Sequence, residues 1–433
     1  MSQTLTSYAN KEVSLQYEGQ RISFFLSQAL FSSYDIDQGS RLLLKSISGS
    51  IDFSGTHRVL DIGCGVGTLG LTLKKKYPRM EMVLQDRDAL AAAFSRINAE
   101  KNGISDITIL GGLAFEGLDG RLFDLIVSNV PAKVGTPVLL HFYRQTLEHL
   151  ATHGTAAIVV VNPIADLTLD SLLEAGADVT LREPASGHTV VHFTHGGKKA
   201  APAGASAKVT PAAEENATGQ RDGKFPHYLK PYARSRIECA AGGVEYTLDT
   251  VWGEADFDTP PYTAALVARM LKTIPPQRKI TVWNPGQGHI PVTAALLMLQ
   301  KGAQPLHVYC AGRDMLALQI TAHNLRRNTG ISDDMLEIQH AADPGFISGV
   351  QSAPELSSAG LRDLMVVECE NLAGVPDPAT ALSAAERLLR PGGFLLLSGK
   401  SAHIHRFFSG KSSFSRHGEK KQHGYRVVAL KRL

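Results

Sequence analysis

A short apolar run that leads directly into three alternate glycines is the feature of this sequence that most restricts its fold. Residues 59–67 read Val-Leu-Asp-Ile-Gly-Cys-Gly-Val-Gly. The apolar part predicts a buried strand over Arg58–Ile62, and the glycines permit a tight turn in which backbone approaches a ligand without an intervening Cβ. A helical pattern over Leu69–Lys76 follows. The sequence therefore predicts a strand, a glycine turn and a helix, with a ligand at the carboxyl end of the strand.

Strand-length apolar runs and helical patterns continue to alternate along the first half. Further strands are predicted at Glu81–Gln85, Ile107–Leu110, Leu125–Ser128 and Ala156–Val161, and a further helix at Ala89–Asn102. This alternation indicates βαβ units and a parallel sheet covered on both faces. Each half ends in two more apolar runs, which we expect to add an antiparallel closing strand: Asp178–Arg182 with Thr189–Thr194, and Phe394–Leu397 with Tyr425–Leu430. The predicted fold class is α/β.

The second half of the sequence repeats landmarks of the first half in the same order. The corresponding motifs are Val59–Gly65 and Val282–Gly288, Arg87-Asp88 and Arg313-Asp314, Asn98 and Asn324, and Phe123–Val127 and Arg362–Val366. Because the matches keep their order across most of each half, chance similarity is a poor explanation. We infer a tandem duplication of one α/β domain.

A segment of different composition separates the two halves. Residues 196–224 are rich in Ala, Gly, Pro and Lys and contain no large apolar side chain. Such a stretch cannot bury enough surface to offset its ordering entropy, so we expect a flexible linker. With 433 residues the chain is also too long for one ordinary core. The expected domains are residues 1–195 and 225–433.

The composition excludes several classes of protein. Hydrophobic residues make up 43% and charged residues 20%, as in a globular soluble protein, and no run reaches the roughly 18 apolar residues of a membrane helix. The four cysteines match neither a zinc spacing nor a disulfide framework, and no secretory signal is visible. We expect a cytoplasmic protein without a membrane partner or a metal. The net charge of +3 neither requires nor excludes a nucleic acid, and nothing indicates the oligomeric state.

Two cofactors compete for the glycine turn. Gly65-x-Gly67-x-x-Gly70, with Asp86 about twenty residues later, satisfies the dinucleotide fingerprint. However, a strand that ends at Ile62 gives the register Asp61-x-Gly63-x-Gly65-x-Gly67, which resembles motif I of class I methyltransferases. An acidic residue before the glycines suits the ammonium and sulfonium of S-adenosylmethionine and would repel a pyrophosphate.

We therefore expect an S-adenosylmethionine site in the first half. Asp61, Gly63, Gly65 and Gly67 are assigned to the methionine end of the cofactor, and Asp86 to the ribose hydroxyls. The alternative is a glycine turn that only packs a helix on a strand.

A second candidate site follows the strand predicted at Leu125–Ser128. The next residues are Asn129-Val130-Pro131-Ala132. An Asn amide oxygen and a backbone carbonyl can accept both hydrogens of an exocyclic amine and so aim its lone pair at a methyl group. The run resembles the Asn-Pro-Pro-(Phe/Tyr) motif of amino-group methyltransferases. Asn129 and Pro131 are the proposed catalytic residues, although an Asn that only caps the strand explains the pattern equally well.

Two residues of that motif are altered. Val130 replaces the first proline, and Ala132 replaces the aromatic residue that would stack on a base, an interaction worth roughly 1–3 kcal/mol. Phe142 or Tyr143 can supply an aromatic face instead if either lies close by.

Together these motifs resemble one family. Phe31-Ser32-Ser33, Asp37-x-Gly39-Ser40 and Leu42–Leu44, followed by motif I and Ser128-Asn129-x-Pro131, look like the ribosomal RNA guanine-N2 methyltransferases of the small and large subunits. Those proteins carry two tandem Rossmann-like methyltransferase domains, of which only one is catalytic. The resemblance implies that Asp37, Gly39 and Ser40 lie near the cofactor, with Asn129 beside it. In that family the intact site is in the C-terminal domain, whereas here the intact motif I is N-terminal.

The second half has lost these chemical groups. In the sequence match, Asn284 stands where Asp61 does, Ile290 replaces Gly67, Gly312 replaces Asp86 and Glu368 replaces Asn129. We expect a degenerate domain that binds no S-adenosylmethionine and that stabilises the first domain or docks substrate. The C-terminal residues 400–432 are strongly basic with interleaved aromatics, which suits either RNA contact or a solvated surface.

The leading functional hypothesis is an S-adenosylmethionine-dependent methyltransferase that modifies an exocyclic amine of a base in ribosomal or other structured RNA. One alternative is a non-catalytic RNA-binding or assembly protein with a relic cofactor site. Another is a methyltransferase for a small molecule or a protein, which the absent stacking aromatic at Ala132 permits.

Overall fold

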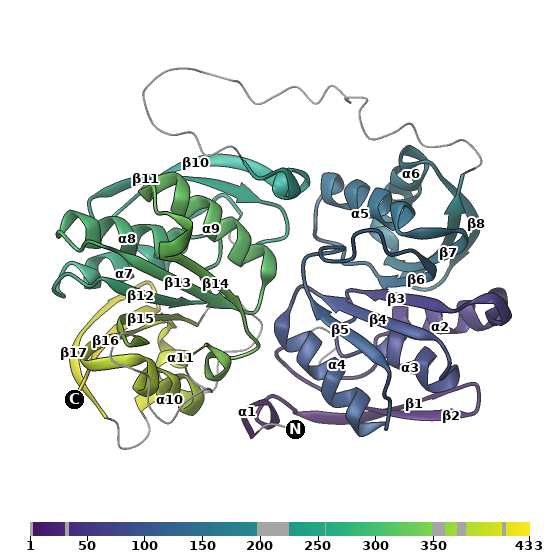
Figure 1. The fold of residues 1–433 in the computed structure, drawn as a ribbon, viewed down its shortest axis with the longest axis horizontal. Coiled ribbons are helices and arrows are strands. Elements are labelled where there is room, and N and C mark those ends of the chain that lie inside the picture. The colour runs from purple at the N-terminus through teal and green to yellow at the C-terminus, as the bar shows by residue number, and fades with distance from the viewer. Residues whose placement is uncertain are drawn as a thin grey trace.

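A computed structural model of the chain describes residues 3–30, 34–196, 225–255, 257–348, 360–369, 378–408 and 413–433. The predicted linker lies outside the described residues except for Gly196, and so does the Phe31-Ser32-Ser33 segment of the family motif. The described residues form two α/β units that lie side by side (Figure 1).

The first unit is built on a seven-stranded sheet with the strand order β5-β4-β3-β6-β7-β9-β8. The strands are β3 (Arg58–Ile62), β4 (Glu81–Asp86), β5 (Ile107–Gly111), β6 (Phe123–Asn129), β7 (Leu150–Val161), β8 (Ala177–Pro184) and β9 (His188–His195). The five strands from β5 to β7 are parallel, while β9 runs antiparallel to both β7 and β8. The antiparallel closure predicted from the sequence is confirmed.

Helices cover both faces of this sheet because neighbouring strand residues point to opposite sides. On one face Val59 packs with α2 (Gln38–Ser50), α3 (Thr68–Lys76) and α4 (Ala89–Lys101). On the other face Leu60 packs with α5 (Thr136–Glu148) and α6 (Ala165–Ala175). Because both faces of the sheet are buried, its central strands are almost continuously apolar in sequence.

A hairpin that the sequence analysis missed precedes the first sheet. After the short α1 (Gln3–Thr6), strands β1 (Lys11–Tyr17) and β2 (Gln20–Leu26) pair antiparallel. Two asparagines of α4 hold β2, since Asn98 Oδ1 accepts from Phe25 N at 2.7 Å and Asn102 Oδ1 accepts from Ser23 N at 2.9 Å. The hairpin thus covers α4 through backbone hydrogen bonds.

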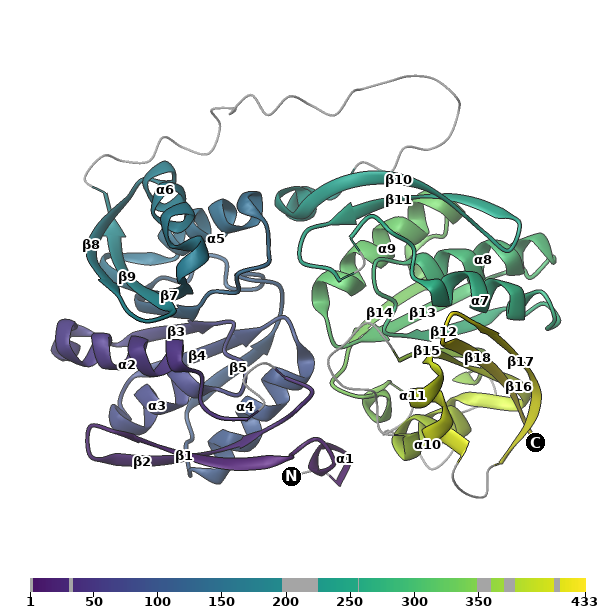
Figure 2. The same ribbon diagram turned by 180° about the vertical axis from the view of Figure 1, so that it is seen from behind.

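The second unit repeats this architecture. Its seven-stranded sheet has the order β14-β13-β12-β15-β16-β18-β17. The strands are β12 (Lys279–Trp283), β13 (His307–Gly312), β14 (Leu336–His340), β15 (Arg362–Glu368), β16 (Leu389–Lys400), β17 (Phe414–Gln422) and β18 (Tyr425–Arg432), with the hairpin β10 (Ala233–Ala241) and β11 (Val244–Val251). The helices are α7 (Tyr262–Leu271), α8 (His289–Gln300), α9 (Met315–Thr329), α10 (Pro378–Leu388) and α11 (Ser401–His405). Figure 2 shows the two sheets from the opposite side.

Individual side-chain contacts also recur in the two units. Asp124 accepts hydrogen bonds from the backbone N–H groups of His57 and Arg58, and Asp363 accepts from those of Arg278 and Lys279. Repetition at this level supports the inferred duplication. The fold class predicted from the sequence, two tandem Rossmann-like domains with antiparallel closing strands, is confirmed.

The residue pairing predicted between the two glycine turns is wrong by two positions. Three residues of each turn have positive φ: Gly63, Gly65 and Gly67 at 73°, 58° and 88°, and Asn284, Gly286 and Gly288 at 57°, 56° and 103°. Asn284 therefore replaces Gly63, Val282 stands at the position of Asp61, and Gly288 rather than Ile290 is equivalent to Gly67. The sequence match was aligned on the shared valine, Val59 and Val282, whereas the positive φ values identify the equivalent residues of the two turns.

Within the described ranges, no helix is long and apolar enough to cross a membrane. In the same part of the chain, no three His, Cys, Asp or Glu side chains are grouped as metal ligands would be. All four cysteines are buried.

Candidate functional site

The candidate site lies at the carboxyl edge of β3, β4 and β6 (Figure 1). From β3 the chain passes to β4 and β5 on one side and then returns to β6 on the other side. In an open parallel sheet, this reversal leaves a crevice outside the strand ends where ligands bind. The glycine turn, Asp86 and Asn129 all lie at this edge because each directly follows or ends one of these strands.

The glycine turn leaves open space in front of its first two glycines. A Cβ added to Gly63 or Gly65 would meet no atom within 4 Å, whereas a Cβ on Gly67 would lie 2.6 Å from Leu71 Cδ1. Gly67 is also the left-handed residue that begins α3. The first two glycines therefore leave room for a ligand, while Gly67 permits the close packing of α3.

Asp61 lies inside β3 and not on the open side of the turn. Its side chain is fully buried, and its Oδ2 accepts from Gly70 N at 2.8 Å in the first turn of α3. Within the described part of the chain, its Oδ1 is buried and has no hydrogen-bond partner. Burial raises the pKa of Asp61 to about 7 because a charged carboxylate is poorly solvated there. The carboxylate fixes the start of α3 and leaves one acceptor atom unused.

Asp86, the last residue of β4, is held in a defined orientation. Its Oδ2 accepts from Gly65 N at 2.8 Å, and its Oδ1 accepts from Asp88 N at 2.8 Å. Burial, followed by the neighbouring charge of Asp88, raises the pKa of Asp86 to about 6. Each oxygen keeps a further lone pair, so the carboxylate can still accept hydroxyl donors from a ligand.

Asn129 is bound to the residues that the family motif assigned to the same pocket. Its Nδ2 donates to Asp37 Oδ2 at 2.7 Å and to Ser40 Oγ at 3.1 Å. Asp37 in turn caps α2 by accepting from Ser40 N at 3.1 Å. Because an ionised carboxylate only accepts, the amide nitrogen must face Asp37, and Asn129 Oδ1 is left to act as an acceptor elsewhere.

The structure adds a histidine to this group. A Cβ on Gly39 would lie 2.9 Å from both Asp37 Oδ2 and His188 Cδ2, so the His188 ring packs beside the Asp37 carboxylate. Its Nδ1 is buried and has no hydrogen-bond partner among the described residues. His188 begins β9, far from Asp37 in the sequence, and no sequence pattern pointed to it.

The two aromatic residues suggested by the sequence differ in how well they fit a stacking role. Tyr143 is fully buried, and its hydroxyl donates to Thr168 Oγ1 at 3.1 Å, so the expectation that it offers a free face is wrong. Phe142 is half-buried and packs on Phe115 with ring centroids 5.7 Å apart. Pro131 and Ala132 are exposed.

An aromatic group from the second unit lies beside the loop that follows Pro131. The Trp252 ring packs on Gly135, where a Cβ would lie 2.8 Å from Trp252 Cδ2. The guanidinium carbon of Arg234 lies 4.4 Å from the Trp252 ring centroid and 4.6 Å from that of Phe257. We call these three residues the Arg234 cluster, and the sequence analysis missed it.

The basic C-terminal residues are divided between the end of β16, α11 with the turn after it, and the β17–β18 hairpin, while Lys411 lies outside the described residues. Glu419 pairs with Arg416, Lys421 and Arg426. Part of the basic charge is therefore neutralised within the hairpin. The proposed RNA contact of this stretch stays a prediction.

Comparison with known proteins finds similarity to methyltransferases in the first half. Residues 21–179 match the methyltransferase small domain. The ribosomal RNA small subunit methyltransferase C of Pseudomonas putida (strain GB-1) is 33% identical over 173 residues, 39% of this chain and 49% of that protein. The uncharacterized protein YbxB of Bacillus subtilis (strain 168) is 28% identical over 186 residues, 42% of this chain and 91% of that protein. The chain thus spans about half the length of the Pseudomonas relative.

One solved structure resembles the whole chain. The T. thermophilus 16S rRNA N2 G1207 methyltransferase RsmC, in complex with AdoMet and guanosine, matches with a TM-score of 0.61 at 17% identity. The match covers 99% of this chain and 100% of that chain. At this identity the similarity shows a shared fold across both units. The resemblance to tandem-domain ribosomal RNA methyltransferases inferred from the sequence is confirmed.

Proposed function

We propose, from the methyltransferase small domain in residues 21–179, that this chain is an S-adenosylmethionine-dependent methyltransferase that acts on ribosomal RNA. The observation that carries the proposal is the hydrogen-bonded group of Asp37, Ser40 and Asn129, at the same strand edge as the open glycine turn and Asp86. A fold-only domain needs no such convergence of open space at a glycine turn and oriented polar groups.

The residues present fit S-adenosylmethionine. The space in front of Gly63 and Gly65 accepts the methionine end, and the oriented Asp86 carboxylate accepts the ribose hydroxyls. The unused Asp61 Oδ1 favours a nearby ammonium electrostatically. The acidic Asp61 directly before the turn disfavours a pyrophosphate there, which argues against a dinucleotide. When bound, S-adenosylmethionine supplies an electrophilic methyl group.

The chain's own contribution to the reaction is orientation of the acceptor. Asn129 Oδ1 and the carbonyl of Val130 accept the hydrogens of an exocyclic amine and direct its lone pair toward the methyl group. Asp37 holds the Asn129 amide in the rotamer that this requires. Val130 N is bonded to Val159 O at 3.0 Å, which fixes the backbone of the altered motif without the first proline. Asn129 and Pro131 thus retain their proposed acceptor role.

An RNA substrate is favoured by the relatives and by the surface next to the acceptor site. The Pseudomonas relative is named as a ribosomal RNA small subunit methyltransferase, and the T. thermophilus structure holds guanosine. The Arg234 cluster offers an exposed aromatic ring, Phe257, and a cation beside the acceptor loop, which suits stacking on an unpaired base. We propose the exocyclic amine of guanine as acceptor, and a cytoplasmic location follows from a ribosomal substrate.

The test is calorimetric titration with S-adenosylmethionine, followed by transfer of a labelled methyl group to small ribosomal subunits, naked 16S RNA and cell extract. We expect binding at one site and label in RNA. Asn129→Ala should lower the transfer rate about 100-fold while cofactor affinity is kept. Asn162→Ala is the matched control, because Asn162 directly follows β7 and its side chain bonds to Ala185 and Thr189.

Other outcomes identify the alternatives. Cofactor binding without transfer to any acceptor would indicate a relic site in an RNA-binding protein. Label in protein or in small molecules, with RNA unlabelled, would indicate a different substrate class. Failure of the wild type to bind S-adenosylmethionine would remove the proposal.

A further inference from the structure

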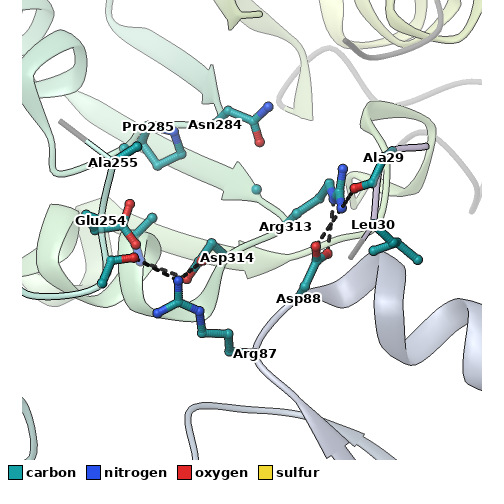
Figure 3. Close-up of a pocket in the computed structure, with 14 residues that line it drawn as sticks. Ala29, Leu30, Arg87, Asp88, Glu254, Ala255, Asn284, Pro285, Arg313 and Asp314 are labelled. Atoms are coloured by element: carbon teal, nitrogen blue, oxygen red, sulfur yellow. Dashed lines mark hydrogen bonds and ion pairs between the residues drawn. The ribbon is translucent and has the colours of Figure 1, made fainter. Parts of the chain in front are cut away.

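The turn that follows Asp86 is held by the second unit at each of its residues (Figure 3). Arg87 Nη2 lies 3.1 Å from Asp314 Oδ2 and donates to Gly253 O at 2.8 Å. Arg313 donates to both carboxylate oxygens of Asp88, from Nε at 3.0 Å and from Nη2 at 2.5 Å. The Arg313 side chain is only 4% exposed, so this bidentate pair is shielded from solvent.

Backbone hydrogen bonds join the same two turns. Ala89 N donates to Arg313 O at 2.9 Å, and Met315 N donates to Arg87 O at 3.0 Å. His340 Nε2 lies 2.8 Å from Arg87 O and 2.7 Å from Arg313 O. Because both partners are carbonyl oxygens, Nε2 must carry the ring proton and donate to them.

The contact is reciprocal because the same dipeptide occurs in both units. Arg87-Asp88 and Arg313-Asp314 each supply one cation and one anion, and each aspartate also caps the helix that follows it. An antiparallel bridge between Asp88 and Asp314 lies at the centre. This is the arrangement of a self-complementary two-fold interface, made here within one chain by duplication.

The interface is directly connected to the carboxylate that we assign to the ribose. Asp86 Oδ1 accepts from Asp88 N, so the position of Asp88 sets one of the two hydrogen bonds that orient Asp86. Asp88, in turn, is fixed by Arg313. Arg313 Nη2 also donates to Ala29 O at 2.9 Å, at the start of the segment that leads to Asp37. One buried arginine of the second unit therefore contacts both the turn after Asp86 and the segment that precedes Asp37.

We infer that Arg313 and Asp314 are positioning residues for the cofactor, and that the second unit acts on the site by fixing the Asp86–Asp88 turn. The inference rests on the proposed binding of S-adenosylmethionine. It gives the degenerate unit a defined role: its own turn has no carboxylate at Gly312, and its Arg-Asp pair serves the neighbouring site instead. A pocket of about 260 Å³ lies beside these pairs and is lined partly by Asn284 and Gly286 of the second unit's own turn.

The first experiment measures the dissociation constant of S-adenosylmethionine by calorimetry for the full chain and two variants. Asp314→Asn keeps the helix cap and the shape but removes the charge that faces Arg87. Arg313→Lys keeps the charge but loses the bidentate geometry. We expect each variant to bind about 5- to 150-fold more weakly, the usual range of coupling between sites. Asp333→Asn breaks the exposed Arg326–Asp333 pair of the same unit and is the matched control.

A double-mutant cycle separates positioning from a general loss of structure. In an Asp86→Ala background, Asp314→Asn should have no further effect on affinity, because the carboxylate that it positions is absent. Thermal melting of each variant reports folding independently. Equal losses of affinity in both backgrounds, or unchanged affinity of both variants, would overturn the inference while the proposed function stands. Absence of binding by the wild type would instead remove the proposed function.

Discussion

At the end of β6, the orientation of the Asn129 amide depends on Asp37, because its other partner, the Ser40 hydroxyl, can donate as well as accept. Asp37 Oδ2 accepts from Asn129 Nδ2 at 2.7 Å, which prevents the amide from turning its nitrogen toward the acceptor site. We predict that Asp37→Asn lowers the methyl-transfer rate about tenfold or more, since an amide at position 37 can present either a donor or an acceptor. The α2 cap should persist because Asn caps as well as Asp. Unchanged transfer kinetics in this variant would contradict the assigned role.

Burial of Asp61 predicts a particular pH dependence of stability. Burial raises the pKa of Asp61 from 3.8 to about 7, so the native protein keeps a proton that the unfolded chain releases between those values. The contribution of Asp61 to the free energy of unfolding is therefore most favourable below about pH 4. It falls as the pH rises through this window, by at most ~1.4 kcal/mol per unit.

The measurement compares chemical unfolding of the wild type and Asp61→Asn from pH 4 to pH 8. We expect the free energy of unfolding of Asp61→Asn, relative to that of the wild type, to increase as the pH rises. A difference that stays flat across this range would mean that Asp61 titrates normally.

At the scale of elements, the glycines of the strand-turn-helix unit have different roles. A Cβ on Gly67 would clash with Leu71, while a Cβ on Gly63 would enter open space, and both residues have positive φ. Gly67→Ala should therefore destabilise the domain by about 1–3 kcal/mol more than Gly63→Ala. Gly63→Ala should mainly weaken S-adenosylmethionine binding, because its methyl group occupies the proposed ligand space.

Urea unfolding and calorimetry on the two variants check this separation of stability from binding. The same loss of stability in both variants, with equal cofactor affinities, would show that the space in front of Gly63 is not the cofactor site.

Some elements were readable from the sequence and others were not. Buried parallel strands have runs of apolar residues, so β3, β4 and β6 were predicted nearly to their ends. The β1–β2 hairpin was missed although Val13, Leu15 and Tyr17 alternate with polar residues. The residues of the two glycine turns were paired wrongly because the sequence match relied on identical residues and not on the conformation of the turn. Backbone φ values at Asn284 and Gly286 decide that register.

At the scale of the whole molecule, the Arg234 cluster predicts where the second unit contacts RNA. Arg234→Ala should weaken RNA binding and reduce the slope of log affinity against log salt by about 1 if the guanidinium reaches a phosphate. Phe257→Ala should remove about 1–3 kcal/mol of stacking with little change in the salt slope. Binding to naked 16S RNA between 50 and 200 mM salt measures both effects.

A matched control lies in the same hairpin. Arg234 and Arg236 each pair with an aspartate, Asp258 and Asp249, but Arg236 lies away from the aromatic cluster, so Arg236→Ala should have the smaller effect. Equal losses for the two arginines would show that the cluster has no special role.

By itself, the sequence determined the duplicated α/β fold, the turn that can hold a cofactor, and the unit in which that turn is intact. These features are local: glycine spacing, apolar runs and an acidic residue at a strand end act within a few residues of one another. Only the tertiary structure decided what surrounds the turn. Asp37, His188 and Asn129 meet because the start of α2, the start of β9 and the end of β6 lie at one edge of the sheet.

The role of the second unit was also beyond the sequence. The repeated Arg-Asp dipeptide was visible, but its pairing with its own copy depends on how the two units pack. Charged side chains take their function from the partner that desolvates them, and that partner is chosen by the fold rather than by neighbours in the chain.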